Sequence, residues 1–399
     1  MTRPFDPRRF YKEALEANGI FAAFGVPDSS LSGLLGYFNA TKSLSEHIVT
    51  ANEGGAVALA AGYYLSTRNV ALAYMQNSGF ANALNPLQSL AAKEVFGIPM
   101  LLMIGWRGKP GEKDEPQHAL VGPRTLDNLR TNNFPYEEIP DTLSGAKEAI
   151  ARLIAKSIQN NTPVALIVPT KTFLEYKDEA PQKIPPAILT RHVKLERWRP
   201  STLDLPLSRE LAIRCLVGHI KSNDVTVSSL GGNSRELYMI RKENGEGVGR
   251  TFFCIGAMGH AFALACGVTM GFSSGRVFCI DGDGSFLMHV GNNAILAGVS
   301  HPNVIHVVIY NGIHSSTGNH PLMIGRDDFL AMAEGLPYKQ KFLVNNAEGL
   351  KRACESTRGG ALVIVAVNNL VRKNLPRPSE SPRELKSKFM KCFVQRSFL

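Results

Sequence analysis

The sequence predicts an α/β protein built from two doubly wound parallel-sheet domains, and three observations point to this class. Short apolar runs alternate with helical stretches throughout, a proline-rich charged segment divides the chain, and the two halves share one pattern at a fixed offset. Continuous apolar strands that end in Gly, Asn, Asp or Ser are typical of a parallel sheet covered by helices on both faces. Such strands occur in both halves, so each half is expected to form its own sheet.

Eight apolar runs are expected to be strands, four in each half. They span residues 19–27, 70–79, 99–106 and 162–170 in the first half, and residues 224–232, 276–284, 303–312 and 361–367 in the second. The stretch between residues 176 and 206 is rich in proline and charge and has no period, which is typical of a linker. We therefore expect a first domain over residues 1–175, a linker over 176–206, a second domain over 207–371 and a basic tail over 372–399.

The two halves carry an internal repeat. When the chain is shifted by 205 residues, GGAVALAAG at residues 54–62 falls on GHAFALACG at residues 259–267, with six of nine positions identical. Without a gap, YMQNSG then falls on CIDGDG, so a helix, a strand and a turn coincide at one offset. This coincidence favours a duplication over the chance sharing of alanine and glycine by two α/β units. Under the duplication, Glu53 corresponds to Met258, and Ser78 to Asp283.

The composition is that of an ordinary globular chain. Its 399 residues are 44% hydrophobic, and no apolar run approaches the roughly 18 residues that a membrane helix needs. Six scattered cysteines form no CxxC pair, so we expect reduced structural thiols and a cytoplasmic protein. Of the net charge of +10, +6 follows residue 371, where we expect a solvated tail. Basic residues are nowhere interleaved with aromatic ones, which argues against a nucleic-acid partner.

Polar side chains follow two neighbouring strands of the second half. Asp283 lies between Gly282 and Gly284 at the end of one strand, and after a spacer of 26 residues Asn311 ends the next. A carboxylate, an amide oxygen and a main-chain carbonyl just beyond form an all-oxygen set that suits Mg²⁺, which usually keeps phosphate oxygens among its ligands. About 26 residues upstream, GAMGHA at residues 256–261 is a second glycine turn entering a helix, whose amides favour anions.

This spacing of GDG and a strand-terminal Asn is similar to the signature of thiamine-diphosphate enzymes, and the resemblance covers nearly the whole chain. It implies a pyrimidine-binding first half and a diphosphate-binding second half without a central third domain. It also implies a homo-oligomer that holds thiamine diphosphate and Mg²⁺ between halves of different subunits. The metal ligands would be Asp283, the side chain of Asn311 and the carbonyl of Ile313, and Met258 would be the apolar wedge under the cofactor. The other implied cofactor-binding residues are Gly256, Gly259, Gly282, Gly284 and Ser285.

Glu53 precedes a helix of small residues in TANEGGAVALAAG. Glu53 could be an acid that shares a proton with a ring nitrogen, a role that needs a dry site. From the residues alone, the alternative is a glutamate that the helix dipole favours at the start of a helix. The family resemblance implies the first role, a hydrogen bond to the aminopyrimidine ring of the cofactor.

Three segments of the first half resemble phosphonopyruvate decarboxylases. They are GVPDS at residues 25–29, MQNSGFANALNPL at 75–87 and LMIGWRGKPGEKDEPQH at 102–118, and the last is the most specific. The resemblance implies decarboxylation of 3-phosphonopyruvate to 2-phosphonoacetaldehyde and CO₂, in phosphonate biosynthesis. Sulfopyruvate decarboxylases share the QNSG-type turn but lack the long third segment.

Candidate substrate residues lie in this third segment. A guanidinium can hold phosphonate oxygens bidentately, so Arg107 with Lys109 or Lys113 is a reasonable clamp for a 2-oxo acid with an anionic tail. The alternative is an exposed charged loop, in which Glu112, Asp114 and Glu115 simply pair with these bases. Gln76, Asn77 and Ser78 are expected to face the substrate. Asp28 or Ser29, together with His118, are the candidates for handling protons near the reacting carbon.

The resemblance is incomplete after Asn311. This chain reads NGIHSSTGNHPLM, where related enzymes read nearer to NGAHDSVGGQPT, so Ser315 replaces an acid and Asn319 a glycine close to the metal corner. Two kinds of alternative stay open. The chain could decarboxylate sulfopyruvate or another 2-oxo acid, or act as a carboligase. It could also be a cofactor-binding scaffold or a tail-mediated nucleic-acid binder.

Overall fold

The computed structural model describes residues 2–177, 193–197, 207–299, 303–357, 359–372 and 374–393. The chain forms two compact units, Met1–Ile184 and Pro185–Leu399. Most of the predicted linker lies outside the described residues. All eight predicted strands are present, and the sheets add short strands that the apolar pattern did not predict.

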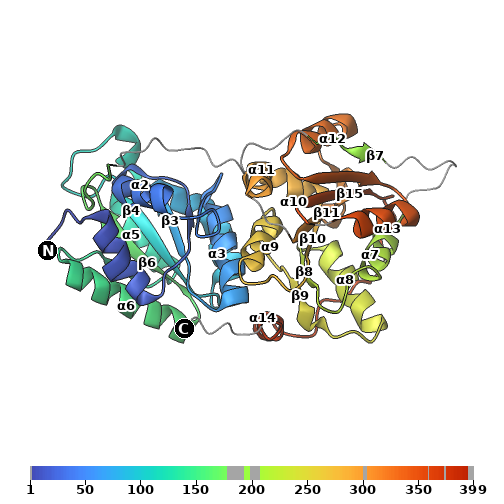
Figure 1. Ribbon diagram of the computed structural model, residues 1–399, viewed down its shortest axis with the longest axis horizontal. Helices are drawn as coiled ribbons and strands as arrows, with labels where there is room; N and C mark the ends of the chain where they lie inside the picture. The colour runs from blue at the N-terminus through green and yellow to red at the C-terminus, as the bar shows by residue number, and fades with distance from the viewer. Residues whose placement is uncertain are drawn as a thin grey trace. The chain divides into compact units, whose positions relative to one another are not determined.

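The first unit contains a six-stranded parallel sheet (Figure 1). Its strands, in spatial order, are β2 (His47–Val49), β1 (Ala23–Gly25), β3 (Leu72–Gln76), β4 (Met100–Trp106), β6 (Pro163–Pro169) and β5 (Tyr136–Glu138). Its helices are α1 (Pro7–Phe10), α2 (Ser32–Thr41), α3 (Glu53–Thr67), α4 (Phe80–Pro86), α5 (Val121–Thr131) and α6 (Leu143–Asn160). Residues 11–18 continue α1 as a π-helical and then a 3₁₀ turn. Every residue of β4 and β6 is buried, because helices cover both faces of the sheet.

The second unit contains a seven-stranded parallel sheet. Its strands, in spatial order, are β7 (Glu196–Arg197), β14 (Gln340–Val344), β15 (Ala361–Ala366), β11 (Val304–Tyr310), β10 (Val277–Gly282), β8 (Val225–Ser228) and β9 (Thr251–Phe253). Read from β9 to β14, this order repeats that of the first sheet from β2 to β5, strand for strand. The shared topology supports the duplication inferred from the sequence repeat. A two-stranded ribbon, β12 (Ile313–His314) with β13 (His320–Pro321), stands apart from the sheet.

Helices also cover both faces of the second sheet. They are α7 (Arg209–Val217), α8 (Gly232–Glu243), α9 (Ala261–Thr269), α10 (Asp283–Met288), α11 (Val290–Gly298), α12 (Arg326–Gly335), α13 (Ala347–Ser356) and α14 (Pro382–Met390). Alternation along β10 assigns the faces: Phe278 and Ile280 join the core with α7, α8 and α13. On the other face, Phe262 of α9 stacks on His306 of β11, with ring centroids 4.3 Å apart. Figure 1 shows these two helical layers.

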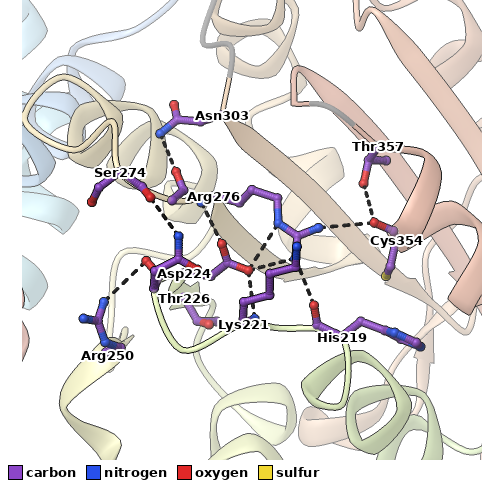
Figure 2. A network of polar contacts seen from close by, with 12 residues as sticks. His219, Lys221, Asp224, Thr226, Arg250, Ser274, Arg276, Asn303, Cys354 and Thr357 are labelled. Carbon is purple, nitrogen blue, oxygen red and sulfur yellow. Dashed lines mark hydrogen bonds and ion pairs between the residues drawn. The ribbon is translucent and has the colours of Figure 1, made fainter.

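A buried polar network holds the amino-terminal edge of the second sheet (Figure 2). Asp224, just before β8, accepts hydrogen bonds from the backbone N–H of Arg276, just before β10, and from its guanidinium. The same guanidinium donates to the carbonyls of His219 and Cys354. Because the strands are parallel, fixing this edge aligns their opposite, carboxyl ends, where ligands bind in open α/β sheets.

The basic tail differs from the sequence expectation. Residues 382–390 form α14, which begins at a capping box formed by Ser381 and Glu384. Leu385 and Phe389 are fully buried, and Phe389 contacts Phe252 of β9. This part of the tail therefore belongs to the core of the second unit, since its apolar face covers the edge of the sheet. Figure 1 shows α14 beside β9.

Two further sequence expectations concern thiols and membranes. All six cysteines are free, and burial raises the pKa of Cys254 and Cys354 to about 12, as expected of structural thiols. None of the helices in the described part of the chain is both long and apolar enough to cross a bilayer.

Candidate active site

The carboxylate of Asp283 is the centre of the predicted metal corner. It is buried at the first position of α10, where one oxygen accepts from the backbone N–H of Gly284 at 2.7 Å. The other accepts from the N–H groups of Asn311 at 2.8 Å and Gly312 at 2.7 Å, beyond β11. Burial raises the pKa of Asp283 above its usual value, although these N–H donors act in the opposite direction. A bound cation would compensate the buried charge.

The other two predicted metal ligands lie in the same place. Asn311 and Ile313 line, together with Asp283, one cavity of about 180 Å³ at the carboxyl edge of the sheet. The described residues contain no cluster of three or more His, Cys, Asp or Glu side chains. The corner instead offers one carboxylate, one amide oxygen and one carbonyl. This all-oxygen set fits Mg²⁺ with phosphate oxygens as its remaining ligands.

The two glycine turns of the second half meet beside this corner. The backbone N–H of Gly259 donates to the hydroxyl of Ser285 at 3.0 Å, which ties GAMG to the GDGS turn. Gly259 has a φ of +85°, which favours glycine. Met258, Gly282, Gly284 and Ser285 line the cavity, whereas Gly256 and Gly259 do not. A Cβ on Gly284 would lie 2.4 Å from the His314 ring, so the close approach at this glycine is made by an imidazole.

Sequence reasoning missed the turn that follows β8. Ser229, Gly231, Gly232 and Asn233 line the same cavity, because β8 lies next to β10 and its carboxyl end reaches the same edge. The signal was present in SSLGGNS, where a buried strand ends in hydroxyls and paired glycines. Arg209, His314 and Ser316 also line the cavity and were not predicted as site residues.

Glu53 is buried at the first position of α3 in the first unit. Asn52 caps this helix by accepting a hydrogen bond from the N–H of Gly55 at 3.0 Å. The helix consists largely of small residues and is buried on nearly all sides. The side chain amide of Asn82 donates to one Glu53 carboxylate oxygen at 2.9 Å. The carboxylate packs against Gly79, where a Cβ would lie 2.0 Å from its other oxygen. Two elements therefore fix the position of this acid.

Asp28 lies at the end of the neighbouring strand β1. Its carboxylate packs against Gly105 of β4 so closely that a Cβ there would lie 1.8 Å from one oxygen. That oxygen accepts from the N–H of Ser30 at 3.1 Å, while the other has no hydrogen-bond partner among the described residues. Burial raises the pKa of Asp28, which favours its protonated form more than in water.

Arg107 follows β4 and lies between an acid and a hydroxyl. Its Nε donates to Asp114 at 2.9 Å, and a second nitrogen completes a bidentate pair with that carboxylate. Its remaining nitrogen donates to the hydroxyl of Ser29 at 2.7 Å. This pair holds the pKa of Asp114 well below its usual range. The acid of the loop therefore does pair with Arg107, as the sequence left open, and the pair presents one guanidinium edge beside Ser29.

The other basic residues of the loop are not brought to Arg107. Lys109 pairs with Glu138 of β5 at 2.9 Å and lies over the ring of Trp106, and Lys113 is exposed. His118 is buried, and its Nδ1 has no hydrogen-bond partner among the described residues.

The QNSG turn after β3 supports this loop. The side chain of Asn77 donates to the carbonyl of Arg107 and to Thr125, both at 2.8 Å, so it anchors the loop. Gln76 donates to the hydroxyl of Ser78, which is exposed at the sheet edge. Of the three predicted substrate residues here, Asn77 is thus fully engaged, while Gln76 and Ser78 remain accessible.

Comparison with known proteins agrees with this geometry. The thiamine pyrophosphate enzyme N-terminal TPP binding domain matches residues 10–127, and the C-terminal TPP binding domain matches residues 238–366. A phosphonopyruvate decarboxylase from Streptomyces viridochromogenes is 31% identical over 94% of this chain and 92% of its own length. A phosphonopyruvate decarboxylase from Streptomyces hygroscopicus is 30% identical over 93% of this chain and 90% of its own length. A sulfopyruvate decarboxylase from Methanosarcina acetivorans is 25% identical over 98% and 99%.

Solved structures show the same fold. A thiamine diphosphate-dependent 4-hydroxybenzoylformate decarboxylase from Rhodococcus jostii RHA1 matches with a TM-score of 0.68, over 91% of this chain and 99% of that chain. A benzoylformate decarboxylase from Polynucleobacter necessarius matches with a TM-score of 0.67, over 92% and 99%. Their identities of 13% and 12% carry the fold alone, and they confirm the predicted fold class. The relatives that match nearly end to end show more: the chain belongs to the thiamine pyrophosphate enzymes, in the family of the phosphonopyruvate decarboxylases.

Proposed function

We propose that this protein decarboxylates 3-phosphonopyruvate to 2-phosphonoacetaldehyde and CO₂ with thiamine diphosphate and Mg²⁺, as a step of phosphonate biosynthesis. The observation that carries the proposal is the oxygen-donor corner of Asp283, Asn311 and Ile313 around one cavity. This corner suits a metal-bound diphosphate, which the matched family requires. The substrate is proposed from the two relatives that match nearly end to end.

The cofactor and the protein divide the work. Bound thiamine diphosphate supplies the electron sink that stabilises negative charge as CO₂ leaves. Asp283, Asn311 and Ile313 would hold the metal, and Met258 would support the cofactor from the cavity wall. Glu53, buried and oriented by Asn82, would hold a proton for the aminopyrimidine ring.

Substrate residues come from the carboxyl edge of the first sheet. The guanidinium edge of Arg107 that faces Ser29 binds the phosphonate together with the Ser29 hydroxyl, since a charge-assisted donor pair suits its oxygens. Burial raises the pKa of Asp28, so this acid gives up its proton less readily than an exposed one. His118 is the second group proposed to handle protons, because its buried Nδ1 is uncommitted in the described structure.

The assembly is proposed to be a homo-oligomer whose sites combine domains of different subunits. Relatives from Methanococcus maripaludis are named as alpha and beta subunits of sulfopyruvate decarboxylase, and each matches less than half of this chain. This chain spans both matches, so one chain would contain the counterparts of the alpha and the beta subunit.

The test is a decarboxylation assay on purified protein with 3-phosphonopyruvate, sulfopyruvate and pyruvate side by side, each with and without thiamine diphosphate and Mg²⁺. Phosphonoacetaldehyde formation is followed by ³¹P NMR and CO₂ release by a coupled assay. We expect turnover of phosphonopyruvate only when both additions are present. Preferential turnover of sulfopyruvate would establish the second candidate, which the end-to-end match to the Methanosarcina acetivorans enzyme favours. No turnover of any 2-oxo acid would refute both.

A further inference from the structure

A buried ion pair stands in the wall of the second-domain cavity. Nε and one terminal nitrogen of Arg209, on α7, donate to the two carboxylate oxygens of Glu236, on α8, at 2.9 and 2.8 Å. The side chain of Glu236 is completely buried and that of Arg209 is 11% exposed. Of the pair, Arg209 lines the cavity and Glu236 does not. Glu236 therefore holds the guanidinium from behind, and the remaining guanidinium edge borders the cavity.

The position of this guanidinium is electrostatically unusual. A Cβ on Gly232, the first residue of α8, would lie 2.4–2.5 Å from three guanidinium atoms, so the group lies directly on the start of that helix. Arg209 is also the first residue of α7. The amino-terminal end of a helix carries partial positive charge and ordinarily attracts acids. Here a cation occupies that place, and α8 has neither a side-chain cap nor an acid in its first turn.

Glu236 compensates only part of this positive charge. The amides that open α8, the guanidinium edge and the hydroxyl-bearing residues Ser229 and Ser316 all border one cavity. Such a set of donors is suited to a phosphate group, which can accept from a guanidinium and from helix amides at once. The donor set lies in the cavity that also contains the Asp283 corner, so the two can act on one diphosphate.

Ser315, which is uncharged, leaves the positive charge of Arg209 available to a ligand. The terminal nitrogen of Arg209 that does not contact Glu236 donates to the Ser315 hydroxyl at 3.4 Å, which is a long hydrogen bond. A carboxylate at this position would pair with Arg209 and neutralise its charge. With serine, the guanidinium keeps a weakly engaged N–H group at the cavity.

We propose that Arg209, positioned by Glu236, binds the diphosphate of the cofactor in the cavity that it shares with the metal corner. The inference rests on the proposed thiamine-diphosphate chemistry. It adds a phosphate ligand outside the GDG and GAMG turns, and it gives the uncharged Ser315 beside Arg209 a role, since this residue leaves the guanidinium charge to the ligand.

The test measures binding without turnover. Isothermal titration calorimetry at fixed Mg²⁺ follows thiamine diphosphate, inorganic diphosphate, thiamine and methylphosphonate in wild type and three variants. The double variant Arg209→Met with Glu236→Met removes both charges and leaves no unpaired buried ion. Ser315→Asp adds a carboxylate next to the guanidinium and keeps the pair. Arg214→Met is the matched control, since Arg214 lies on the same helix, pairs with Glu210 and Glu243, and is outside the cavity lining.

We expect the double variant to bind thiamine diphosphate and inorganic diphosphate on the order of 10- to 100-fold more weakly, because it loses charge-assisted hydrogen bonds to the ligand. Ser315→Asp should weaken them in the same direction, whereas thiamine binding and the Arg214→Met control stay at the wild-type level. Wild-type diphosphate affinity in the folded double variant would overturn the inference, as would an equal loss for thiamine. Loss of methylphosphonate binding alone would assign the site to the substrate instead. Failure of wild type and control to bind thiamine diphosphate would refute the proposed function itself.

Discussion

Gly79 offers a way to move the proposed acid Glu53 without changing its charge. A Cβ at Gly79 would lie 2.0 Å from a Glu53 carboxylate oxygen, and real Cβ contacts essentially never fall below 3.0 Å. Gly79→Ala must therefore displace the carboxylate by about 1 Å. Gly79 has a φ of −72°, which alanine adopts without strain, so the backbone should tolerate the change.

The expected cost follows from this displacement. A shift of about 1 Å at a reacting group can lower a rate on the order of 100-fold, which corresponds to about 2.7 kcal/mol of transition-state stabilisation. Glu53→Gln, which removes the acid, should cost about 100- to 10,000-fold, the usual range of general acid–base catalysis. The two changes act on one interaction, so adding Gly79→Ala to Glu53→Gln should cost little more.

The assay is steady-state decarboxylation of phosphonopyruvate at saturating thiamine diphosphate and Mg²⁺, with thermal melting as a check of folding. Gly36→Ala is the control, because a Cβ there makes an ordinary contact of 3.4 Å with Tyr176 in the same domain. A Gly79→Ala enzyme with nearly wild-type kcat would show that the position of Glu53 is unimportant. Fully additive losses in the double variant would show that Gly79 acts through another group.

Three further changes probe the two domains. Asp28→Asn should raise Tm at pH 7 but not at pH 3. Burial raises the pKa of Asp28 in the folded state above 3.8, so the folded protein binds this proton more tightly than the unfolded chain does. Ionisation of Asp28 therefore lowers the free energy of unfolding as pH rises, and asparagine removes that loss. An equal shift at both pH values in calorimetry would contradict this. Asp283→Ala should abolish Mg²⁺-dependent thiamine diphosphate binding in titration calorimetry, since it removes the sole carboxylate among the described residues that line the cavity, and retained Mg²⁺ dependence would count against the metal corner. Asp224→Ala should lower the free energy of unfolding by about 3 kcal/mol in urea denaturation, because it leaves the backbone N–H of Arg276 without its acceptor and the guanidinium without its carboxylate partner. A loss below about 1 kcal/mol would mean that the network is not stabilising.

The strands and the metal corner were accessible to sequence reasoning for one physical reason. Parallel strands that are buried on both faces must be apolar throughout, and their carboxyl ends must meet at one edge. A polar residue at the end of β10 and another at the end of β11 are therefore neighbours whatever the rest of the chain does, which is why Asp283 and Asn311 could be paired. The short edge strands β2, β5 and β9 have no such signature, because three residues are too few to leave a readable pattern.

Pairing between charged side chains could not be predicted from the sequence by this local argument. The sequence left open whether Arg107 would meet an acid of its own loop or a ligand, and only the fold shows its bidentate contact with Asp114. Arg209 and Ser315 are 106 positions apart, and no local spacing brings them together.

The sequence by itself determined the two-sheet architecture, the repeat, the family and the GDG–Asn corner, because apolar periodicity and strand-end residues are local. Tertiary structure alone decided which acid neutralises which base, that residues 382–390 fold onto β9, and that a guanidinium lies at the start of α8. These outcomes depend on side chains that meet across long separations, where the distance and burial of each pair, rather than its spacing in the chain, set the interaction.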